Sequence, residues 1–512
     1  MISASSRLSR CLPVLVVLIV GTLWWTSSRL RDRSSELASA ALGIAKHGKP
    51  GAVRPKWKPG MCNVPEIEYL RRPELGLTTN IVYSRRCIKP TFGKPDRNVV
   101  ANITRPLITG KTNVNLSDCA IPELPPCDDL PLQVSPVYPS KEYPHLIFGV
   151  ASTYDRIRDS LPAFSHWLSG TGAQLVGIIA DADEKRSNYN LTKLEEVYKS
   201  AGVLATFTGP KMKKRIYRQG QKGEPTAPPL MEHHHFLLVQ ELLALATPGV
   251  TEWLAILDDD TFFPSLYPLD AELARHDHTT PLWLGALSDD FQSIRNWGYM
   301  AYGGAGVFIS VPLAELVAPQ SERCLREATT ETGDGILRDC IYSQSRAVLT
   351  IVPGLYQHDF RGDPSGFFES APHVLSLHHW KSWYRAPVAA MARVATAVCG
   401  DCFLQRWRLG DDTVLANGYS IAVYRKGVLD KLDLTRVEGT WLHPTRDFDM
   451  AYGTLREKLE RKEKKSYLLK DAVVEDVEGE GRVFRQFYVH SLGEAWEDAS
   501  GPDEVIELVW EL

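Results

Sequence analysis

The chain has 512 residues, which leaves room for two or three folded units with connecting segments. Its hydrophobic fraction of 44% and charged fraction of 23% are those of an ordinary globular protein, and they exclude a fibrous or wholly disordered chain. A formal net charge of -4 gives no electrostatic reason to expect a nucleic-acid partner.

An apolar run near the N-terminus predicts a membrane anchor. It extends from Cys11 to Trp25, has arginines on both sides, and is long enough to span a bilayer when residues 26–28 are included. A cleaved signal peptide is the alternative, but no small-x-small cleavage site follows, and the paired Trp24 and Trp25 suit a membrane interface. We therefore predict that residues 1–30 form a cytoplasmic tail and a transmembrane signal anchor.

Glycosylation sequons indicate on which side of the membrane the rest of the chain lies. They begin at Asn102, Asn115 and Asn190, all after the apolar run, where a lumenal chain can be glycosylated. The arginines that flank the run are too evenly balanced to set the orientation by themselves. The sequons therefore favour a single-pass type II protein of the Golgi or endoplasmic reticulum membrane, with its main part in the lumen.

The cysteines agree with an oxidising compartment. Of nine cysteines, Cys11 lies in the apolar run, and the other eight are an even number available for pairing. A zinc site at Cys399 and Cys402 is an alternative use, but no matching second pair lies nearby. Short sequence spacings suggest the disulfides Cys119–Cys127, Cys324–Cys340 and Cys399–Cys402, which would leave Cys62 to pair with Cys87.

The composition changes twice along the chain. Residues 31–140 are rich in proline, basic residues and asparagine with little periodicity, which predicts a stem with cysteine-stapled turns and no packed domain. Apolar strands are expected at 146–151 and 175–180 with helical stretches between them, which is typical of a parallel sheet with crossover helices. We predict that residues 141–415 form this α/β domain and that residues 416–512 form a small β-rich appendage.

An acidic triplet follows a buried strand in the middle of the α/β domain. Residues 253–257 (WLAIL) lead directly into Asp258, Asp259 and Asp260. Since side chains alternate along an extended chain, Asp258 and Asp260 can point the same way. Two carboxylates at the carboxyl end of a parallel strand suit a hard divalent ion that keeps positions open for a substrate diphosphate.

Two other interpretations compete for the triplet. One aspartate caps the next helix while the others are solvated, or the strand is a Walker-B strand of a nucleoside triphosphatase. The second requires a phosphate loop, and the only Gly-Lys-Thr, at residues 110–112, has Arg105 where the leading glycine belongs. The nucleoside-triphosphatase interpretation therefore fails, and the capping interpretation stays open.

Further motifs follow the triplet in a fixed order. Residues 301–306 (AYGGAG) form a glycine turn, in which a backbone can approach a ligand closely. Residues 333–335 (GDG), 375–380 (LSLHHW) and 417–420 (NGYS) come after it. In this order the motifs resemble the Fringe-like branch of the β-1,3-glycosyltransferases, and within it a fungal and plant group, over residues 145–425. The resemblance implies a GT-A type fold, a Rossmann-like mixed sheet flanked by helices that binds a nucleotide sugar.

The resemblance also implies roles for individual residues. Asp260, with Asp258 as helper, would hold Mn²⁺ against the diphosphate of a UDP-sugar, and one of His378 and His379 would complete the site, because strand alternation lets only one reach it. Asp334 would be the general base of an inverting transfer. The family often has two adjacent acidic residues there, whereas this chain has one, and a turn aspartate between two glycines is the structural alternative.

The remaining candidates lie at strand tips and beside the glycine turn. The run His233-His234-His235 lacks the spacing of a zinc protease and is interpreted as structural. Aromatic faces pack against sugar CH groups, which favours Trp297 and Tyr299 as acceptor contacts. The full candidate sets are Thr153, Arg156, Asp181, Asp183 and Asp259 for the donor, and Trp297, Tyr299, Gly303, Gly304 and Ala305 for the acceptor pocket.

The sequence thus predicts an inverting, metal-dependent glycosyltransferase. It would move a sugar from a UDP-sugar to a hydroxyl of a glycan or glycoconjugate, with a β-1,3 linkage expected from the family resemblance. Two alternatives remain: a non-catalytic lumenal binding or chaperone-like relative, and a metal-dependent hydrolase or phosphotransferase. The second alternative lacks the second metal-ligand cluster that two-metal phosphoryl chemistry requires.

Overall fold

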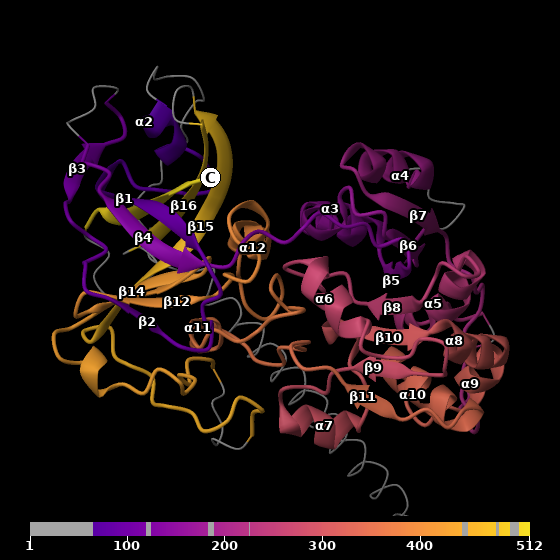
Figure 1. The fold of residues 1–512 in the computed structure, drawn as a ribbon. Helices are drawn as coiled ribbons and strands as arrows, with labels where there is room; N and C mark the ends of the chain where they lie inside the picture. Colours follow the sequence, from indigo (N-terminus) through magenta and orange to yellow (C-terminus); the bar gives the residue numbers. More distant parts are fainter. Residues whose placement is uncertain are drawn as a thin grey trace, which may run out of the picture. The chain divides into compact units, whose positions relative to one another are not determined.

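The computed structural model describes residues 65–118, 124–182, 189–224, 226–442, 449–477, 481–491 and 501–512. Within these residues the strands form two sheets (Figure 1). The seven-stranded sheet has the order β11-β9-β10-β8-β5-β6-β7. Strands β8, β5, β6 and β7 are parallel, β10 is antiparallel to both β8 and β9, and β11 is parallel to β9. The predicted α/β class with a mixed sheet is confirmed. Its strands are β5 (Leu146–Ser152), β6 (Gln174–Ile179), β7 (Leu204–Thr208), β8 (Trp253–Leu257), β9 (Trp283–Gly285), β10 (Val307–Ser310) and β11 (Leu349–Ile351).

The central strand β8 is apolar throughout because both faces of this sheet are buried. Trp253, Ala255 and Leu257 pack into one core, and Leu254 and Ile256 pack into a second core on the opposite face. Buried residues of α5, α8 and α10 belong to the second core, and those of α3, α4 and α6 belong to the first. The helices of this part are α3 (Tyr154–Leu168), α4 (Leu191–Ser200), α5 (Met231–Leu245), α6 (Leu266–Leu273), α7 (Phe291–Trp297), α8 (Val311–Val317), α9 (Ser321–Glu327), α10 (Gly333–Gln344), α11 (Ser365–Glu369) and α12 (Val388–Ala397).

The second sheet has ten strands and joins both ends of the described chain. Its order is β2-β12-β13-β14-β15-β16-β17-β1-β3, and β4 pairs with β1. Strand β1 runs parallel to both β17 and β4, so neighbouring strands come from distant parts of the sequence. The strands are β1 (Asn80–Phe92), β2 (Ala101–Ile103), β3 (Thr112–Asn115), β4 (Asp129–Val134), β12 (Arg406–Leu409), β13 (Thr413–Ala416), β14 (Ser420–Tyr424), β15 (Lys464–Val477), β16 (Gly481–His490) and β17 (Asp503–Glu511), and the short helix α2 (Pro65–Leu70) precedes them.

This sheet corrects the predicted stem and appendage. The described part of residues 31–140 is packed, because Ile81, Tyr83 and Ile88 of β1 are buried in cores shared with the C-terminal strands. The boundary at residue 415 is also absent, since β13 and β14 are adjacent strands on either side of it. The basic pair Arg85 and Arg86 in the middle of β1 hid its alternating apolar pattern from the sequence analysis.

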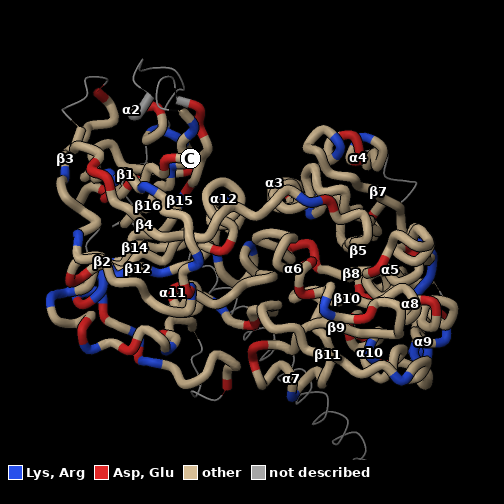
Figure 2. Tube along the Cα trace, viewed as in Figure 1, with Lys and Arg blue, Asp and Glu red and all other residues tan. Residues whose placement is uncertain are grey.

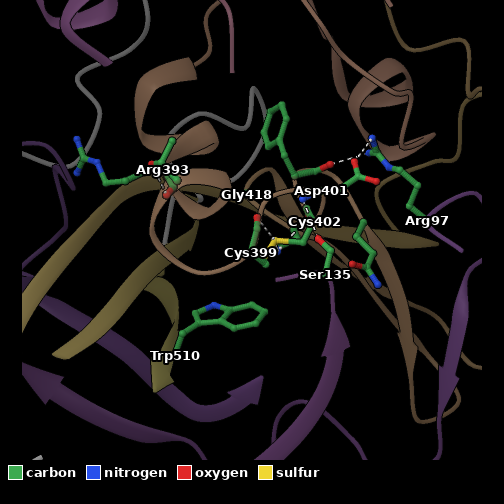
Figure 3. Close-up of a disulfide and its surroundings, with 12 residues drawn as sticks. Arg97, Ser135, Arg393, Cys399, Asp401, Cys402, Gly418 and Trp510 are labelled. Carbon is green, nitrogen blue, oxygen red and sulfur yellow. Dashed lines mark hydrogen bonds and ion pairs between the residues drawn. A yellow bond between two sulfur atoms is a disulfide. The ribbon is translucent and has the colours of Figure 1, made fainter. Parts of the chain in front are cut away.

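Three disulfides lie in the described residues, and two of them were predicted. Cys324–Cys340 links α9 to α10, and Cys399–Cys402 closes the turn after α12 (Figure 3), which uses the cysteines of the alternative zinc site. The predicted Cys119–Cys127 and Cys62–Cys87 pairs are wrong, because Cys87 pairs with Cys127. The pairing is determined by strand adjacency and not by sequence spacing. Strands β1 and β4 are neighbours, and Cys87 lies opposite Asp129, two residues from Cys127. Cys62 and Cys119 lie outside the described residues.

The turn at Cys399–Cys402 also ties the early strands to the end of the α/β region (Figure 3). The backbone N–H of Asp401 donates to Ser135 Oγ at 2.8 Å, and the Asp401 carboxylate accepts from Arg97 at 3.2 Å. Arg97 donates as well to the carbonyl of Phe403 at 2.7 Å. Residues that the sequence analysis placed in the stem are therefore bonded directly to the segment that follows α12.

The predicted compartment stays a prediction, because nothing in the described residues tests it. Asn102, Asn115 and Asn190 are all exposed, which leaves these side chains accessible to glycosylation. The predicted anchor at residues 1–30 lies outside the described residues, and within the described ranges none of the helices is long and apolar enough to cross a membrane. Figure 2 shows acidic and basic residues distributed over both sheets and their helices, in keeping with the small net charge.

Candidate active site at the carboxyl end of β8

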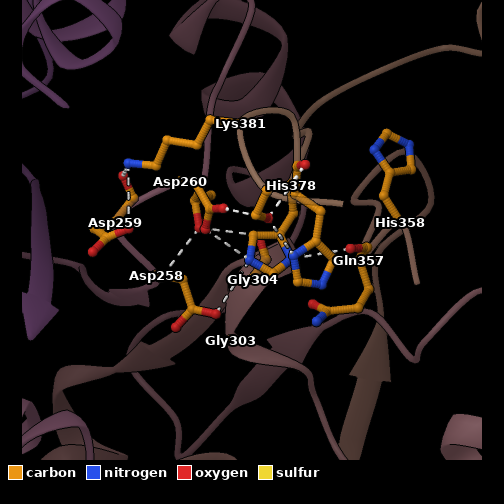
Figure 4. Close-up of polar contacts among 12 residues, drawn as sticks. Asp258, Asp259, Asp260, Gly303, Gly304, Gln357, His358, His378 and Lys381 are labelled. Carbon is orange, nitrogen blue, oxygen red and sulfur yellow. Dashed lines mark hydrogen bonds and ion pairs between the residues drawn. The ribbon is translucent and has the colours of Figure 1, made fainter. Parts of the chain in front are cut away.

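The acidic triplet divides between two sides of the chain where β8 ends (Figure 4). Asp258 and Asp260 both face the imidazole of His378, whose Nε2 lies 3.3 Å from Asp258 Oδ2 and 3.0 Å from Asp260 Oδ1. The Asp260 side chain is only 6% exposed, whereas that of Asp258 is 41% exposed. The cluster is therefore anchored in the interior at Asp260 and open to solvent at Asp258.

His378 is held in one orientation by its other ring nitrogen. Its Nδ1 lies 3.0 Å from the backbone carbonyl of Gln357 and donates to it, which leaves Nε2 directed at the two carboxylates. Burial alone would lower the pKa of His378, but hydrogen bonds and attraction from Asp258 and Asp260 outweigh it and raise the pKa to about 10. In turn, His378 holds the pKa of Asp260 well below its usual range, although burial of that carboxyl opposes the shift.

His379 reaches the same cluster, which corrects the expectation that only one histidine can. Its backbone has a φ of 57°, so the alternation of an extended strand is broken at this residue. The ring centroids of His378 and His379 lie 3.7 Å apart, and the face of His379 stacks on Trp383 at 4.0 Å. Its Nε2 lies 3.3 Å from Asp359 Oδ1. One ligand atom from each of Asp260, His378 and His379 lies within 4.8 Å of the others.

These residues fit a divalent transition ion. Carboxylate and imidazole are the donors that such ions take, and a ligating histidine commonly donates its second ring N–H to a backbone carbonyl, as His378 does to Gln357. Gly304 is required beside this ring, because a Cβ at that position would lie 2.1 Å from both Cε1 and Nδ1 of His378. The lack of a side chain at Gly304 therefore leaves the space that the His378 ring occupies.

Asp259 has a separate, structural set of contacts. Its carboxylate is buried and accepts two hydrogen bonds from Arg156, each of 2.5 Å, and one from Ser152 Oγ. Lys381 Nζ lies 3.3 Å from the same carboxylate. Asp259 and Arg156, two predicted donor contacts, are thus bonded to each other on the side away from His378.

Asp334 lies next to the glycine turn, in the first turn of α10. Its Oδ2 accepts from the backbone N–H of Gly303 at 2.9 Å, while its Oδ1 has no hydrogen-bond partner within the described residues. Thr332 caps the helix, so Asp334 is not needed for that task. Burial, with a smaller contribution from the charge of Asp258, raises the pKa of Asp334 to about 6 in spite of the nearby His235.

His235 is a site residue that the sequence analysis missed. It lies in the first turns of α5, and its Nε2 is 3.5 Å from Asp258 Oδ1 and 3.9 Å from Asp334 Oδ1. The run of three histidines on a predicted helix was interpreted as structural because it lacks zinc-protease spacing. The available signal was topological: a helix that leads into β8 begins at the edge of the sheet where β8 ends.

The other candidates lie near the site with different contacts. Asp181 accepts from the backbone N–H of Tyr154 at 2.8 Å beyond the ends of β5 and β6, and Thr153 precedes α3. Asp183 lies outside the described residues. In the glycine turn, Gly303 contacts Asp334, and Ala305 N–H donates to Gln357 Oε1 at 2.9 Å. The exposed side chains of Trp297 (55%) and Tyr299 (53%) lie on the segment that enters this turn.

The chain is similar to one family of proteins and to several solved structures. A family model described as a protein of unknown function, DUF604, matches residues 292–400, which include Asp334, His378 and His379. No curated protein matches the chain. The matching solved structures include the galactosyltransferase LgtC with donor and acceptor sugar analogs, at 12% identity, 47% of this chain, 87% of that chain and a TM-score of 0.29.

Two further matches are of the same kind. Mouse xyloside xylosyltransferase 1 is 10% identical, over 41% of this chain and 85% of that chain, with a TM-score of 0.27. The glycosyltransferase GlyE of Streptococcus pneumoniae is 12% identical, over 50% of this chain and 61% of that chain, with a TM-score of 0.28. All three matches are glycosyltransferases.

Proposed function

We propose that this chain is a metal-dependent glycosyltransferase of the GT-A type that transfers a sugar from a nucleoside-diphosphate sugar to a hydroxyl group. One observation carries the proposal: a carboxylate–imidazole cluster at the carboxyl end of β8 lies beside Asp334, a carboxyl group with one oxygen unpaired in the described structure. The cluster supplies a place for a divalent ion and a diphosphate, and Asp334 supplies a base. Donor activation and acceptor deprotonation are the two requirements of this reaction.

In the proposed reaction, Asp334 Oδ1 accepts the proton of the acceptor hydroxyl. The acceptor oxygen forms a bond to the anomeric carbon while the bond from that carbon to the diphosphate oxygen breaks, and the electron pair leaves with the diphosphate. Attack from the face opposite the leaving group inverts the configuration. A divalent ion held by Asp258, Asp260, His378 and His379 would supply charge neutralisation for the departing diphosphate.

The chain's own residues prepare this step in three ways. The Gly303 N–H holds Asp334 Oδ2, while Oδ1 has no hydrogen-bond partner among the described residues. Burial raises the pKa of Asp334 to about 6, which makes its carboxylate a better proton acceptor than an exposed aspartate. The exposure of Asp258 leaves the cluster open for a substrate to enter.

Finer features of the proposal are supported by the sequence. The family resemblance favours Mn²⁺, a UDP-sugar donor, a glycan or glycoconjugate acceptor and a β-1,3 linkage. The sequons at Asn102, Asn115 and Asn190, the disulfides and the apolar run at the N-terminus favour a type II protein of the Golgi or endoplasmic reticulum. The donor base would lie near Thr153 and Asp181, and the acceptor near Trp297 and Tyr299.

A donor screen tests the proposal. The purified protein is incubated with each common UDP-sugar, with and without Mn²⁺, and release of UDP is measured in the presence of mixed sugar acceptors. We expect metal-dependent release from one donor and its loss in Asp260→Ala with the fold retained. A binding or chaperone-like relative would bind glycans without releasing UDP from any donor, and that outcome would replace the proposal.

A further inference from the structure

We infer that His235 is a positioning residue for Asp334, and that the two side chains work as a pair. The inference rests on the proposed function and adds a residue to its machinery. His235 Nε2 lies 3.9 Å from Asp334 Oδ1, the oxygen that is left without a hydrogen bond within the described residues. Both ring nitrogens of His235 are likewise buried and make no hydrogen bond to any described residue.

Buried polar atoms that lack partners are rare, and they mark places where a ligand or a small movement completes the bonding. Catalytic hydrogen bonds are often long before substrate binds and shorten in the complex. A shift of about 1 Å would bring His235 Nε2 into hydrogen-bond distance of Asp334 Oδ1. Because Gly303 already holds Oδ2, that contact would fix the second oxygen of the carboxylate as the acceptor hydroxyl approaches.

The local backbone is shaped around this ring. A Cβ at Gly333 would lie 2.5 Å from His235 Nδ1, and a Cβ at Gly303 would lie 2.9 Å from Nε2 and 2.7 Å from Asp334 Oδ1. Glycines on both sides therefore give the imidazole and the carboxylate room to face each other. This accounts for the glycine that precedes Asp334, because a side chain at Gly333 would meet the ring of His235.

His235 also connects the base to the metal cluster. Its Nε2 lies 3.5 Å from Asp258 Oδ1, on the solvent-open side of the cluster. The imidazole stands beside both carboxylates, so it can hold Asp334 at a fixed position relative to the donor site. Positioning of this kind changes the rate of the chemical step more than it changes ground-state binding.

The first test is kinetic and uses neighbouring histidines as matched variants. His235→Phe retains a ring without nitrogens, His235→Gln restores a polar terminus, and His234→Phe makes the same change at a buried neighbour on α5. We expect His235→Phe to lower kcat ~10- to 100-fold, with donor KM and Mn²⁺ affinity within about twofold of wild type. His235→Gln should recover part of kcat, and His234→Phe should keep it. An unchanged kcat in His235→Phe would overturn the inference and leave the glycosyltransferase proposal standing.

The second test does not depend on activity. The ring ¹⁵N resonances of histidine-labelled protein are compared between wild type and Asp334→Asn. We expect the resonances of His235 to shift while those of His233 and His234 stay in place, since only His235 faces the altered carboxyl. Unchanged His235 resonances would overturn the pairing. If the wild type releases UDP from no donor, the proposed function fails, and this measurement still decides whether the two side chains are coupled.

Discussion

Replacement of Gly304 by alanine is the sharpest test of the metal cluster. The added Cβ would lie 2.1 Å from Cε1 and Nδ1 of His378. The imidazole already has three close neighbours, because Gln357 O lies 3.0 Å from Nδ1, Asp260 Oδ1 lies 3.0 Å from Nε2, and the ring of His379 lies at 3.7 Å. The substitution therefore adds one methyl group at the point where the cluster is most tightly packed.

The magnitude follows from these distances. Carbon atoms in contact are about 3.5–4.0 Å apart, so the His378 ring would have to move by roughly 1.5 Å. Metal–nitrogen bonds tolerate deviations of only about 0.2 Å, so His378 would cease to be a ligand. We expect Mn²⁺ affinity to fall at least ~10- to 100-fold. Overpacking should also cost about 1–3 kcal/mol of the free energy of unfolding.

The assay is a calorimetric Mn²⁺ titration together with thermal unfolding of wild type, Gly304→Ala and Gly110→Ala. The last variant is the control, because a Cβ at Gly110 would meet its nearest atom at an ordinary 3.6 Å. The double variant Gly304→Ala/His378→Ala should recover thermal stability, since the clash is gone, without recovering metal affinity. Wild-type Mn²⁺ affinity in Gly304→Ala would refute the assignment of His378 as a ligand.

Three further outcomes follow from the site and its surroundings. Asp334→Asn should retain UDP and Mn²⁺ binding, measured by calorimetry, and lose transfer, because the amide cannot accept the acceptor proton. In the wild type, transfer should fall as the pH decreases through about 6, the pKa to which burial raises Asp334, since only the carboxylate acts as a base. Asp289→Asn should remove a pH dependence of stability. Burial, with repulsion from Asp359, raises the pKa of Asp289 to about 7 although the His358 N–H opposes the shift. The folded state then keeps a proton that the unfolded chain releases near pH 4, so wild-type stability should fall by about 3 kcal/mol as the pH rises from 4 to 7. Urea unfolding of the variant at several pH values should show a flatter profile.

The α/β part of the fold could be predicted from the sequence because each of its strands has an apolar pattern of its own. The run Trp253–Leu257 is apolar throughout and ends in charged residues, as a strand buried on both faces should. The ten-stranded sheet was not readable, because β1 pairs with β17 across more than four hundred residues and carries Arg85 and Arg86 in its centre. Burial of a basic residue depends on distant partners, such as Thr109 and Asp128 for Arg86, and no local pattern reports them.

The site shows the same division between local and distant information. Alternation along the strand predicted that Asp258 and Asp260 share a side and that Asp259 does not. It failed at His379, where the positive φ returns the second imidazole to the cluster. His235 was missed because its role depends on where α5 begins relative to β8 and α10. The disulfide Cys87–Cys127 was missed for a similar reason, since strand adjacency decided the pairing.

Because Asp259 and Asp260 have separate contacts, we expect the change to asparagine to affect stability at Asp259 and metal binding at Asp260. Asp259 forms ion pairs with Arg156 and Lys381, so Asp259→Asn should weaken both pairs. We expect the free energy of unfolding to fall by only about 1–3 kcal/mol, because the Arg156 side chain is more than half exposed and solvent screens its charge. It should leave Mn²⁺ affinity within about twofold of wild type. Asp260→Asn removes a carboxylate that faces His378 and should abolish Mn²⁺ binding. Since an ion that binds only the folded state raises its stability, Mn²⁺ should raise the Tm of wild type and of Asp259→Asn but not that of Asp260→Asn. The reverse pattern, with the metal-induced rise lost in Asp259→Asn and kept in Asp260→Asn, would show that the triplet presents its middle carboxylate to the ion and that the division of the triplet proposed here is wrong.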